Sequence, residues 1–346
     1  MRNAWSVLPD EWPALLAERN VKPYRAAQIL QCLYRDMIGS WDAATTLPKD
    51  LRETLSRDFP FTACETLAET QSADGTRKLL VGFGDGASVE TVLIPARGRF
   101  TQCVSTQSGC AMGCAFCASG SLGLARSLSA DEIVAQYMAG RRHGEITNLV
   151  MMGMGEPFAN YDAVMRALKL INAGKGPNLG ARHITISTCG VVPGMEKLAA
   201  EKIQFELSVS LHAAFDGLRS ELMPVNRTWP LDTLLAACAK YTRLTKRAVT
   251  FEYTLIKGVN DSRRDALELA RRVGEVPLAK VNLIPLSPVS HRPDFATPDE
   301  ETIMMFLDVL MKRRVQTTIR RSRGKDASAA CGQLKLQTPP RPRSAS

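Results

Sequence analysis

Long apolar runs are missing from this chain of 346 residues. A helix that crosses a bilayer needs roughly 20 consecutive apolar residues, and no run of about 18 occurs, which argues against a membrane-spanning helix. The first five residues, MRNAW, contain no apolar segment of the kind that a signal peptide requires. We therefore expect a cytoplasmic protein without a membrane partner.

A disulfide scaffold is also missing, although the chain has nine cysteines. Three of them crowd into residues 110–117, which fits a reducing compartment better than a disulfide-stapled fold. Apolar residues make up 45% of the chain, enough for a real core, and the length allows one large or two modest domains. The formal charge of +9 favours a polyanionic partner, with nucleic acid as the first candidate.

The clustered cysteines, Cys110, Cys114 and Cys117, have the spacing C-x3-C-x2-C in the run GCAMGCAFC. A structural zinc ion needs four ligands, and the sequence offers neither a fourth cysteine at a zinc-finger spacing nor a downstream histidine nearer than His143. Cysteine thiolates also hold cubane iron–sulfur clusters, where three of them leave one iron open. The spacing, with Phe116 before the last cysteine, resembles the signature of radical S-adenosylmethionine (SAM) enzymes.

Three parts are expected along the chain. Residues 1–90 predict a small, mainly helical accessory domain, with helical periodicity at 25–34 and 51–55 and a strand pair at 78–83 and 89–94. Residues 91–335 are expected to form the core domain, which includes the loop that carries Cys331. Residues 336–346 are rich in proline and arginine and predict a disordered basic tail.

The core sequence alternates between strand and helix patterns, which predicts an α/β fold with a parallel sheet. About six such units favour a partial (β/α)6 barrel, with functional residues in the loops after the strands. Helix starts with cap residues and early acids occur at residues 129–132 and 297–300. The expected strands are 101–105, 147–152, 183–187, 204–210, 249–255, 280–285 and 315–319, and the expected helices lie near 130–141, 161–173, 193–201, 231–243, 262–273 and 298–312.

Polar or glycine-rich segments follow several of these strands. They are GMGEP at 153–157, STCG at 187–190 and the end of SVSLH at 208–212. Glycines allow close backbone approach to a ligand, and hydroxyls bind ribose or carboxylate oxygens. In isolation, a tight turn explains GMGEP equally well, and ordinary turn capping is the better explanation of the other two segments. Cys331 stands among small residues near the C-terminus, where it is either an accessible thiol or a small buried hydrophobe.

Taken together, these segments resemble the RlmN-like radical SAM methyltransferases, which methylate C2 of adenosine in 23S rRNA, at the peptidyl transferase centre, and beside the anticodon in certain tRNAs. The resemblance extends over nearly the whole chain and includes VETVLIP at 89–95, NLIP at 282–285 and AACGQL at 329–334. The related Cfr-type enzymes, which methylate C8 and confer antibiotic resistance, share the two extra cysteines. Pro157, directly after GMGE, resembles the C2 enzymes more than the C8 enzymes.

The resemblance implies a methyl relay. C2 of adenine is no nucleophile, so Cys331 first takes a methyl group from one SAM, and a radical made from a second SAM removes hydrogen from that S-methyl group. The carbon radical adds to C2, Glu90 removes the C2 proton, and Cys103 attacks the sulfur of Cys331. Methylated RNA leaves, and a transient Cys103–Cys331 disulfide remains. The implied cofactors are one [4Fe–4S] cluster on Cys110, Cys114 and Cys117, and two SAM per turnover.

The resemblance also implies the SAM-binding residues. The family usually has an asparagine where this chain has Ser287, which is shorter but keeps a donor and an acceptor. Cys189 stands where serine is common and receives no redox role. The implied contacts are Gly155, Glu156, Ser187, Ser210, Leu211, His212 and Ser287.

The implied RNA partners are 23S rRNA and tRNA. The resemblance also implies a flavodoxin-type electron donor and a thiol reductant, and the enzyme is expected to be a monomer. RNA contacts are expected from a group of basic residues near the C-terminus, although solvent-exposed charges would look the same. Two further interpretations stay open: a non-enzymatic iron–sulfur or zinc RNA-binding protein, and a radical SAM enzyme acting on a protein or small molecule. The basic candidates are Arg313, Arg314, Arg320, Arg321, Arg323 and Lys325.

Overall fold

The computed structural model describes residues 2–324, 326–334 and 336. Lys325 and residues 337–346 of the expected tail lie outside the described residues. Within the described part, no helix is both long and apolar enough to cross a membrane.

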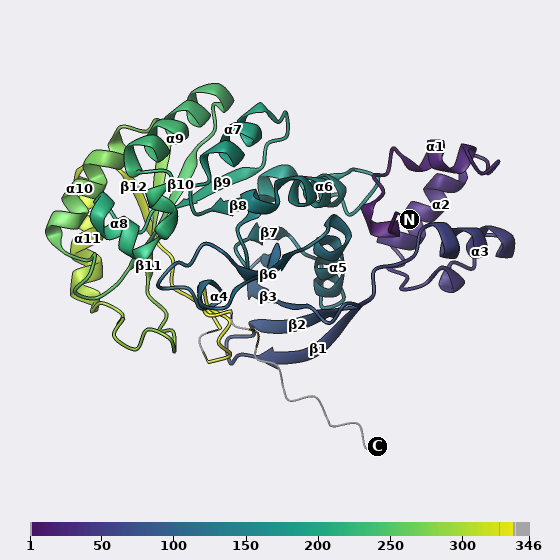
Figure 1. The fold of residues 1–346 in the computed structure, drawn as a ribbon, viewed down its shortest axis with the longest axis horizontal. Coiled ribbons are helices and arrows are strands. Elements are labelled where there is room, and N and C mark those ends of the chain that lie inside the picture. Colours follow the sequence, from purple (N-terminus) through teal and green to yellow (C-terminus); the bar gives the residue numbers. More distant parts are fainter. Residues whose placement is uncertain (1, 325, 335, 337–346) are drawn as a thin grey trace, which may run out of the picture.

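Three helices near the N-terminus stand apart from the rest, at the opposite end of the molecule from α10 and α11 (Figure 1). Aromatic side chains hold them together: the Trp12 ring lies 5.0 Å from Phe59 and 6.2 Å from Trp41, and the Trp41 indole donates to the Phe59 carbonyl at 2.7 Å. The elements are η1 (Ala4–Ser6), α1 (Trp12–Ala17), α2 (Arg25–Tyr34), η2 (Trp41–Ala43) and α3 (Lys49–Asp58).

The remainder is built on a ten-stranded sheet in the order β1-β2-β3-β4-β7-β8-β9-β10-β11-β12. Its first strands, β1 (Cys64–Gln71), β2 (Arg77–Phe83), β3 (Ser88–Ala96) and β4 (Arg99–Cys103), are antiparallel. The expected boundary at residue 90 therefore falls inside β3, in a strand that pairs directly with the core. The helical part ends before β1.

From β4 onward, all neighbouring strands of the sheet are parallel and connected by helices, which confirms the predicted partial (β/α)6 barrel. Ser129 forms a capping box at the start of α5, and Asp299 caps α11, as their sequence predicts. The strands are β7 (Asn148–Met151), β8 (Ile184–Thr188), β9 (Glu206–Ser210), β10 (Val249–Leu255), β11 (Ala279–Pro285) and β12 (Gln316–Ile319). The helices are α5 (Ala130–Arg141), α6 (Tyr161–Asn172), α7 (Val192–Ala200), α8 (Asp216–Leu222), α9 (Leu231–Thr245), α10 (Arg263–Gly274) and α11 (Glu300–Lys312).

The barrel is open, because β1 and β12 stand at the two ends of the sheet. The C-terminal segment crosses this opening beside β2 and α4 (Figure 1). Gly324 donates its amide to Asp74 at 3.0 Å, and the Leu334 carbonyl accepts from Ser119 at 2.8 Å. These bonds fix both ends of the loop that carries Cys331.

Candidate functional site

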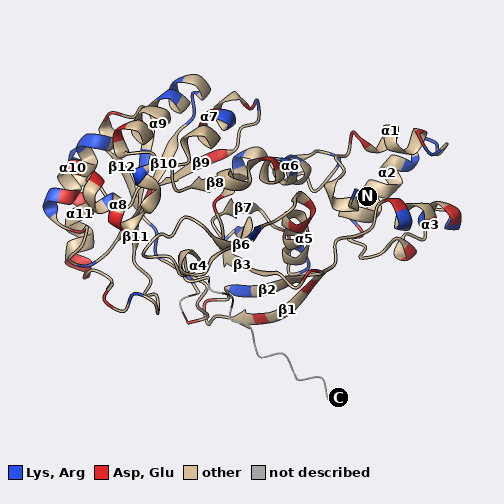
Figure 2. Cartoon of the chain, in the orientation of Figure 1, with Lys and Arg blue, Asp and Glu red and all other residues tan. Residues whose placement is uncertain are grey.

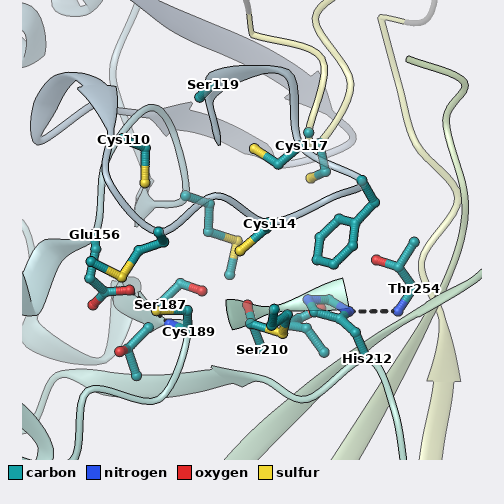
Figure 3. A pocket seen from close by; sticks show the side chains of 18 of the residues that line it. Cys110, Cys114, Cys117, Ser119, Glu156, Ser187, Cys189, Ser210, His212 and Thr254 are labelled. Atoms are coloured by element: carbon teal, nitrogen blue, oxygen red, sulfur yellow. Dashed lines mark hydrogen bonds between the residues drawn. The ribbon is translucent and has the colours of Figure 1, made fainter. Parts of the chain in front are cut away.

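A cavity of about 160 Å³ lies where the parallel strands end. The loop that carries Cys110, Cys114 and Cys117 forms one wall, and side chains at the ends of β8 and β9, including Ser187 and Ser210, form the opposite wall (Figure 3). The carboxyl ends of parallel strands meet at one edge of a sheet, so segments far apart in sequence converge here.

The cysteine loop starts from a two-stranded hairpin, β5 (Gln107–Cys110) with β6 (Gly123–Ser127), and continues into α4 (Ala118–Ser121). Gly109 has a φ of +79°, and a Cβ at this position would lie 1.9 Å from the Gly123 carbonyl oxygen. Only glycine fits such a site. Ala118, directly after the last cysteine, donates its amide to the Gly332 carbonyl at 2.7 Å, so the cysteine loop is tied to the Cys331 loop.

The three thiols suit a cationic metal centre. Burial raises the pKa of Cys110 to about 11, and it raises the pKa values of Cys114 and Cys117 as well, helped by the charges of the neighbouring thiolates. A bound metal reverses this effect, because coordinating thiols lose their protons. Among the described residues, no three His, Cys, Asp or Glu side chains converge on one ion. A cubane does not require this, because each cysteine binds a different iron.

Glu156 is buried and already hydrogen-bonded to the backbone. Its carboxylate accepts from the amides of Phe158 at 3.0 Å and Cys189 at 2.7 Å, which ties the loop after β7 to the loop after β8. Burial raises the pKa of Glu156. Gly155, at a φ of +97°, lines the cavity, but a Cβ there would lie 2.6 Å from the Gln107 side chain. The glycine is thus needed for packing on β5 as well as for approach to a ligand.

His212 follows β9 and is neutral in this environment. Its Nδ1 accepts from the Thr254 amide at 2.9 Å, so a proton on the ring resides on Nε2. Burial, together with the charge of Arg219, lowers the pKa of His212 to about 3. The ring stands edge-on to Phe116 of the cysteine loop, with centroids 4.5 Å apart. Leu211 is buried beside it and belongs to the core rather than to the cavity wall.

Ser287 lines the cavity after β11, and its hydroxyl is buried without a hydrogen-bond partner among the described residues. A buried hydroxyl without a partner is unfavourable. This orphaned group at the wall fits a polar ligand in the cavity, as the sequence predicts for SAM.

Arg219 organises this region, although the sequence did not single it out. Its guanidinium is fully buried and donates to the carbonyls of Leu211 at 3.1 Å, Ser210 at 3.0 Å and Cys189 at 2.9 Å, and to the Asn226 side chain at 2.8 Å. One side chain thereby holds together the ends of β8 and β9.

Cys331 lies between this cavity and a second one of about 450 Å³ inside the barrel. Cys331 is exposed and lines both cavities, whereas the buried Cys103 lines only the second. Burial raises the pKa of Cys103 to about 12, and a thiolate at Cys331 adds to the effect. Arg320 also lines both cavities, and negative charge at Cys331 raises its pKa.

Glu90 lies in β3, buried, with its carboxylate 3.0 Å from the Lys78 ammonium. Its main-chain carbonyl accepts from Ser105, just beyond β4, at 2.6 Å. Glu90 is not among the described residues that line either cavity.

The basic residues that were expected to contact RNA lie in different parts of the structure. Arg313 and Arg314 are exposed after α11, and Arg321 pairs with Glu300 at 2.5 Å. Arg323 donates to the Pro95 carbonyl. Arg320 lines both cavities beside Cys331, so its contact with RNA phosphates near this thiol stays a prediction.

Comparisons with known proteins identify this arrangement. The model of the radical SAM superfamily matches residues 104–270. The probable dual-specificity RNA methyltransferase RlmN of Moorella thermoacetica is 44% identical over 341 residues, covering 95% of this chain and 96% of its own. The dual-specificity RNA methyltransferase RlmN of Pelobacter propionicus is 46% identical over 312 residues, covering 90% and 89%. The chain belongs to the RlmN family of radical SAM methyltransferases.

A solved structure agrees with this assignment. The crystal structure of a radical SAM methyltransferase from Sphaerobacter thermophilus matches with a TM-score of 0.93 at 47% identity, covering 96% of this chain and 99% of that one. The match therefore extends over nearly the whole length of both chains. Membership of the radical SAM family implies a [4Fe–4S] cluster and SAM.

Proposed function

We propose that this protein methylates C2 of an adenosine in 23S rRNA, at the peptidyl transferase centre, and of an adenosine beside the anticodon in tRNAs. The observation that carries the proposal is the position of Cys331, an exposed thiol between the cavity of the cysteine loop and Cys103. A methyl relay requires a carrier thiol that faces both the methyl source and a second thiol. Full-length similarity to relatives named for this activity supports the same assignment.

In this proposal, Cys110, Cys114 and Cys117 hold the [4Fe–4S] cluster, and the cavity wall holds SAM. The cluster with SAM supplies one-electron chemistry that makes the unreactive C2 accessible. Backbone groups at Gly155 and Glu156 and the side chains of Ser187, Ser210, His212 and Ser287 orient SAM. Since His212 is neutral and its Nδ1 is occupied, its Nε2–H is the group that faces a ligand. Leu211 contributes apolar packing.

Three side chains handle the methyl group and the proton. Cys331 accepts a methyl group from SAM as a thioether, Glu90 takes the proton from C2, and Cys103 attacks the sulfur of Cys331 to free the product. Lys78, 3.0 Å from Glu90, orients the carboxylate, and the pairing of β3 with β4 keeps that strand beside Cys103. Two SAM are consumed per turnover, and an external electron donor and a thiol reductant restore the enzyme.

RNA binding rests on charge and on the accessory helices. The net charge of +9 favours a polyanion, and α3, α10 and α11 each carry both acidic and basic residues (Figure 2). Because β1 and β2 belong to the core sheet, a truncation must stop before Cys64. Removing residues 1–62 is expected to weaken RNA affinity at least ten-fold, and unchanged affinity would show that these helices do not bind RNA. RNA substrates and free cysteines fit a cytoplasmic location.

The test is an anaerobic assay of the reconstituted protein with SAM, a reductant and an rRNA or tRNA fragment, read by mass spectrometry of nucleosides. Wild type and a Cys64→Ala control should both give C2-methyladenosine, because Cys64 lies in β1, outside both cavities. Cys331→Ala should give none. C8-methyladenosine would move the protein to the Cfr-type branch. Deoxyadenosine without methylated RNA would refute the RNA substrate.

A further inference from the structure

The second cavity, here called the channel, extends along the inside of the barrel and has a mixed polar and apolar lining. Alternate residues of the parallel strands face it, among them Thr185 of β8, Ser208 of β9, Thr250 of β10 and Asn282 of β11. Closed barrels of parallel strands normally fill their interior with branched apolar side chains. Here hydroxyl and amide groups line a volume of about 450 Å³, which is large enough for a small solute.

The channel runs from the starts of the strands to the two thiols. Arg99 and Glu206 are the first residues of β4 and β9 and line one end, while Cys103, the last residue of β4, and Cys331 line the other. This entrance is opposite to the cofactor cavity, which lies where the strands end. Of the two cavities, Cys331 lines both, whereas Cys103 lines the channel and not the cofactor cavity.

The hydrogen bonding of the Glu252 carboxylate indicates that the channel can hold a polar solute or water. One carboxylate oxygen accepts from Ser208 at 3.2 Å and from Asn282 at 3.0 Å. The other oxygen is buried without a hydrogen-bond partner among the described residues, and the side chain faces both cavities. A buried polar atom in a roomy polar cavity is normally satisfied by water. A solute at Glu252 would therefore lie where the channel meets the cofactor cavity.

The entrance carries excess positive charge. Glu206 is paired with Arg247 at 3.3 Å. Arg99 instead donates to the neutral Asn148 side chain at 3.0 Å, and Arg323 donates to the Pro95 carbonyl. These neutral partners leave the charges of Arg99 and Arg323 available, and a cationic rim concentrates anionic solutes.

We propose that this channel admits a small anionic thiol that reduces the Cys103–Cys331 disulfide. The inference rests on the proposed methyl relay, which forms that disulfide. One thiolate attacks the disulfide, forms a mixed disulfide and releases one cysteine; a second thiol releases the other. Two thiols become one external disulfide, and two electrons reach the protein. A protein dithiol is too large for this route, and the reductant need not displace SAM.

The channel is tested on the reconstituted holoenzyme with SAM bound, without reference to methyl transfer. Small methanethiosulfonates of opposite charge transfer a thioalkyl group to Cys103 and release methanesulfinate, and peptide mass spectrometry gives the rate. The anionic ethylsulfonate reagent should react about ten-fold faster than the cationic ethylammonium reagent. Thr250→Trp should slow both about ten-fold by filling the channel, whereas Lys240→Trp on exposed α9 should not. Arg99→Glu should reduce or reverse the charge preference without blocking the channel.

Equal Cys103 labelling in wild type and a folded Thr250→Trp variant, or an unchanged charge preference in Arg99→Glu, would overturn the channel. A second arm follows turnover: 2-mercaptoethanesulfonate should sustain repeated methyl transfer in wild type better than a protein dithiol does. Equal turnover with the protein dithiol in both wild type and Thr250→Trp would also refute it. Absence of the disulfide after one turnover would instead refute the relay, while the labelling rates would still report the channel.

Discussion

Replacing Arg219 by methionine should destabilise the ends of β8 and β9, which form the proposed SAM-binding wall of the cavity. The guanidinium makes four hydrogen bonds, to the carbonyls of Cys189, Ser210 and Leu211 and to Asn226. Methionine keeps most of the apolar bulk but donates no hydrogen bond.

The expected loss of stability is a balance. Each buried carbonyl left without its donor costs about 1–3 kcal/mol. Removing the guanidinium recovers several kcal/mol of its desolvation, since burying a charge is itself unfavourable. Because three carbonyls lose a donor, we expect a net loss of about 3 kcal/mol, a large fraction of the roughly 5–15 kcal/mol that stabilises a typical protein.

Urea denaturation followed by circular dichroism measures this loss, and equilibrium binding to the reconstituted enzyme measures SAM affinity. Arg271→Met is the matched control, because the exposed Arg271 pairs with Glu268 and Glu275 on α10 and should cost less than about 1 kcal/mol. SAM affinity should fall at least ten-fold in Arg219→Met and stay unchanged in the control. Equal stability of both variants would show that the buried hydrogen bonds of Arg219 do not hold the strand ends.

Three further predictions concern the same region. Gly109→Ala should lower the iron bound per chain after reconstitution, because its Cβ would clash with the Gly123 carbonyl; full iron content would contradict this. The pKa of His212 is about 3 in the folded chain, so the unfolded chain binds more protons below pH 6.5 and stability rises with pH. From pH 4 to 6, wild type should gain about 1.4 kcal/mol per pH unit relative to His212→Asn in urea denaturation, and parallel pH profiles would disprove it. Ser287→Ala should leave stability intact but weaken SAM binding about five-fold, whereas reduced stability would assign the hydroxyl a partner in the protein.

The sequence predicted the parallel part of the barrel closely, because its signals are local. The expected strand 249–255 coincides with β10, and the expected helix 130–141 coincides with α5. Ser129 and Glu132 form the capping box of this helix. The site followed from a topological rule: loops after parallel strands share one edge. That rule brings Glu156 and Ser187 into one cavity although they lie on different strands.

Other features depend on contacts that local patterns do not encode. Strand β1 was not expected, since most of its residues are exposed and none is fully buried, so no alternation marks it. Arg219 lies in a short polar helix and looks like a surface residue; its burial depends on carbonyls up to 30 residues away in sequence. Arg320 was expected near Cys331, but the sequence did not show that it lines both cavities, because its position depends on how β12 pairs with β11.

The hollow interior of the barrel has a signal that the sequence does contain. In β8, Ile184 and Ile186 are buried in the core, while Thr185 and Ser187 face the two cavities. A parallel strand covered by helices on one face and packed on the other would be apolar throughout. Polar residues at every second position, hydroxyl or carboxylate, continue in β9 and β10 and therefore indicate that the inner face meets water or ligand. The sequence does not show how far this row of inward-facing polar residues continues along the barrel. Its extension to the first residues of the strands distinguishes a channel from a cofactor pocket.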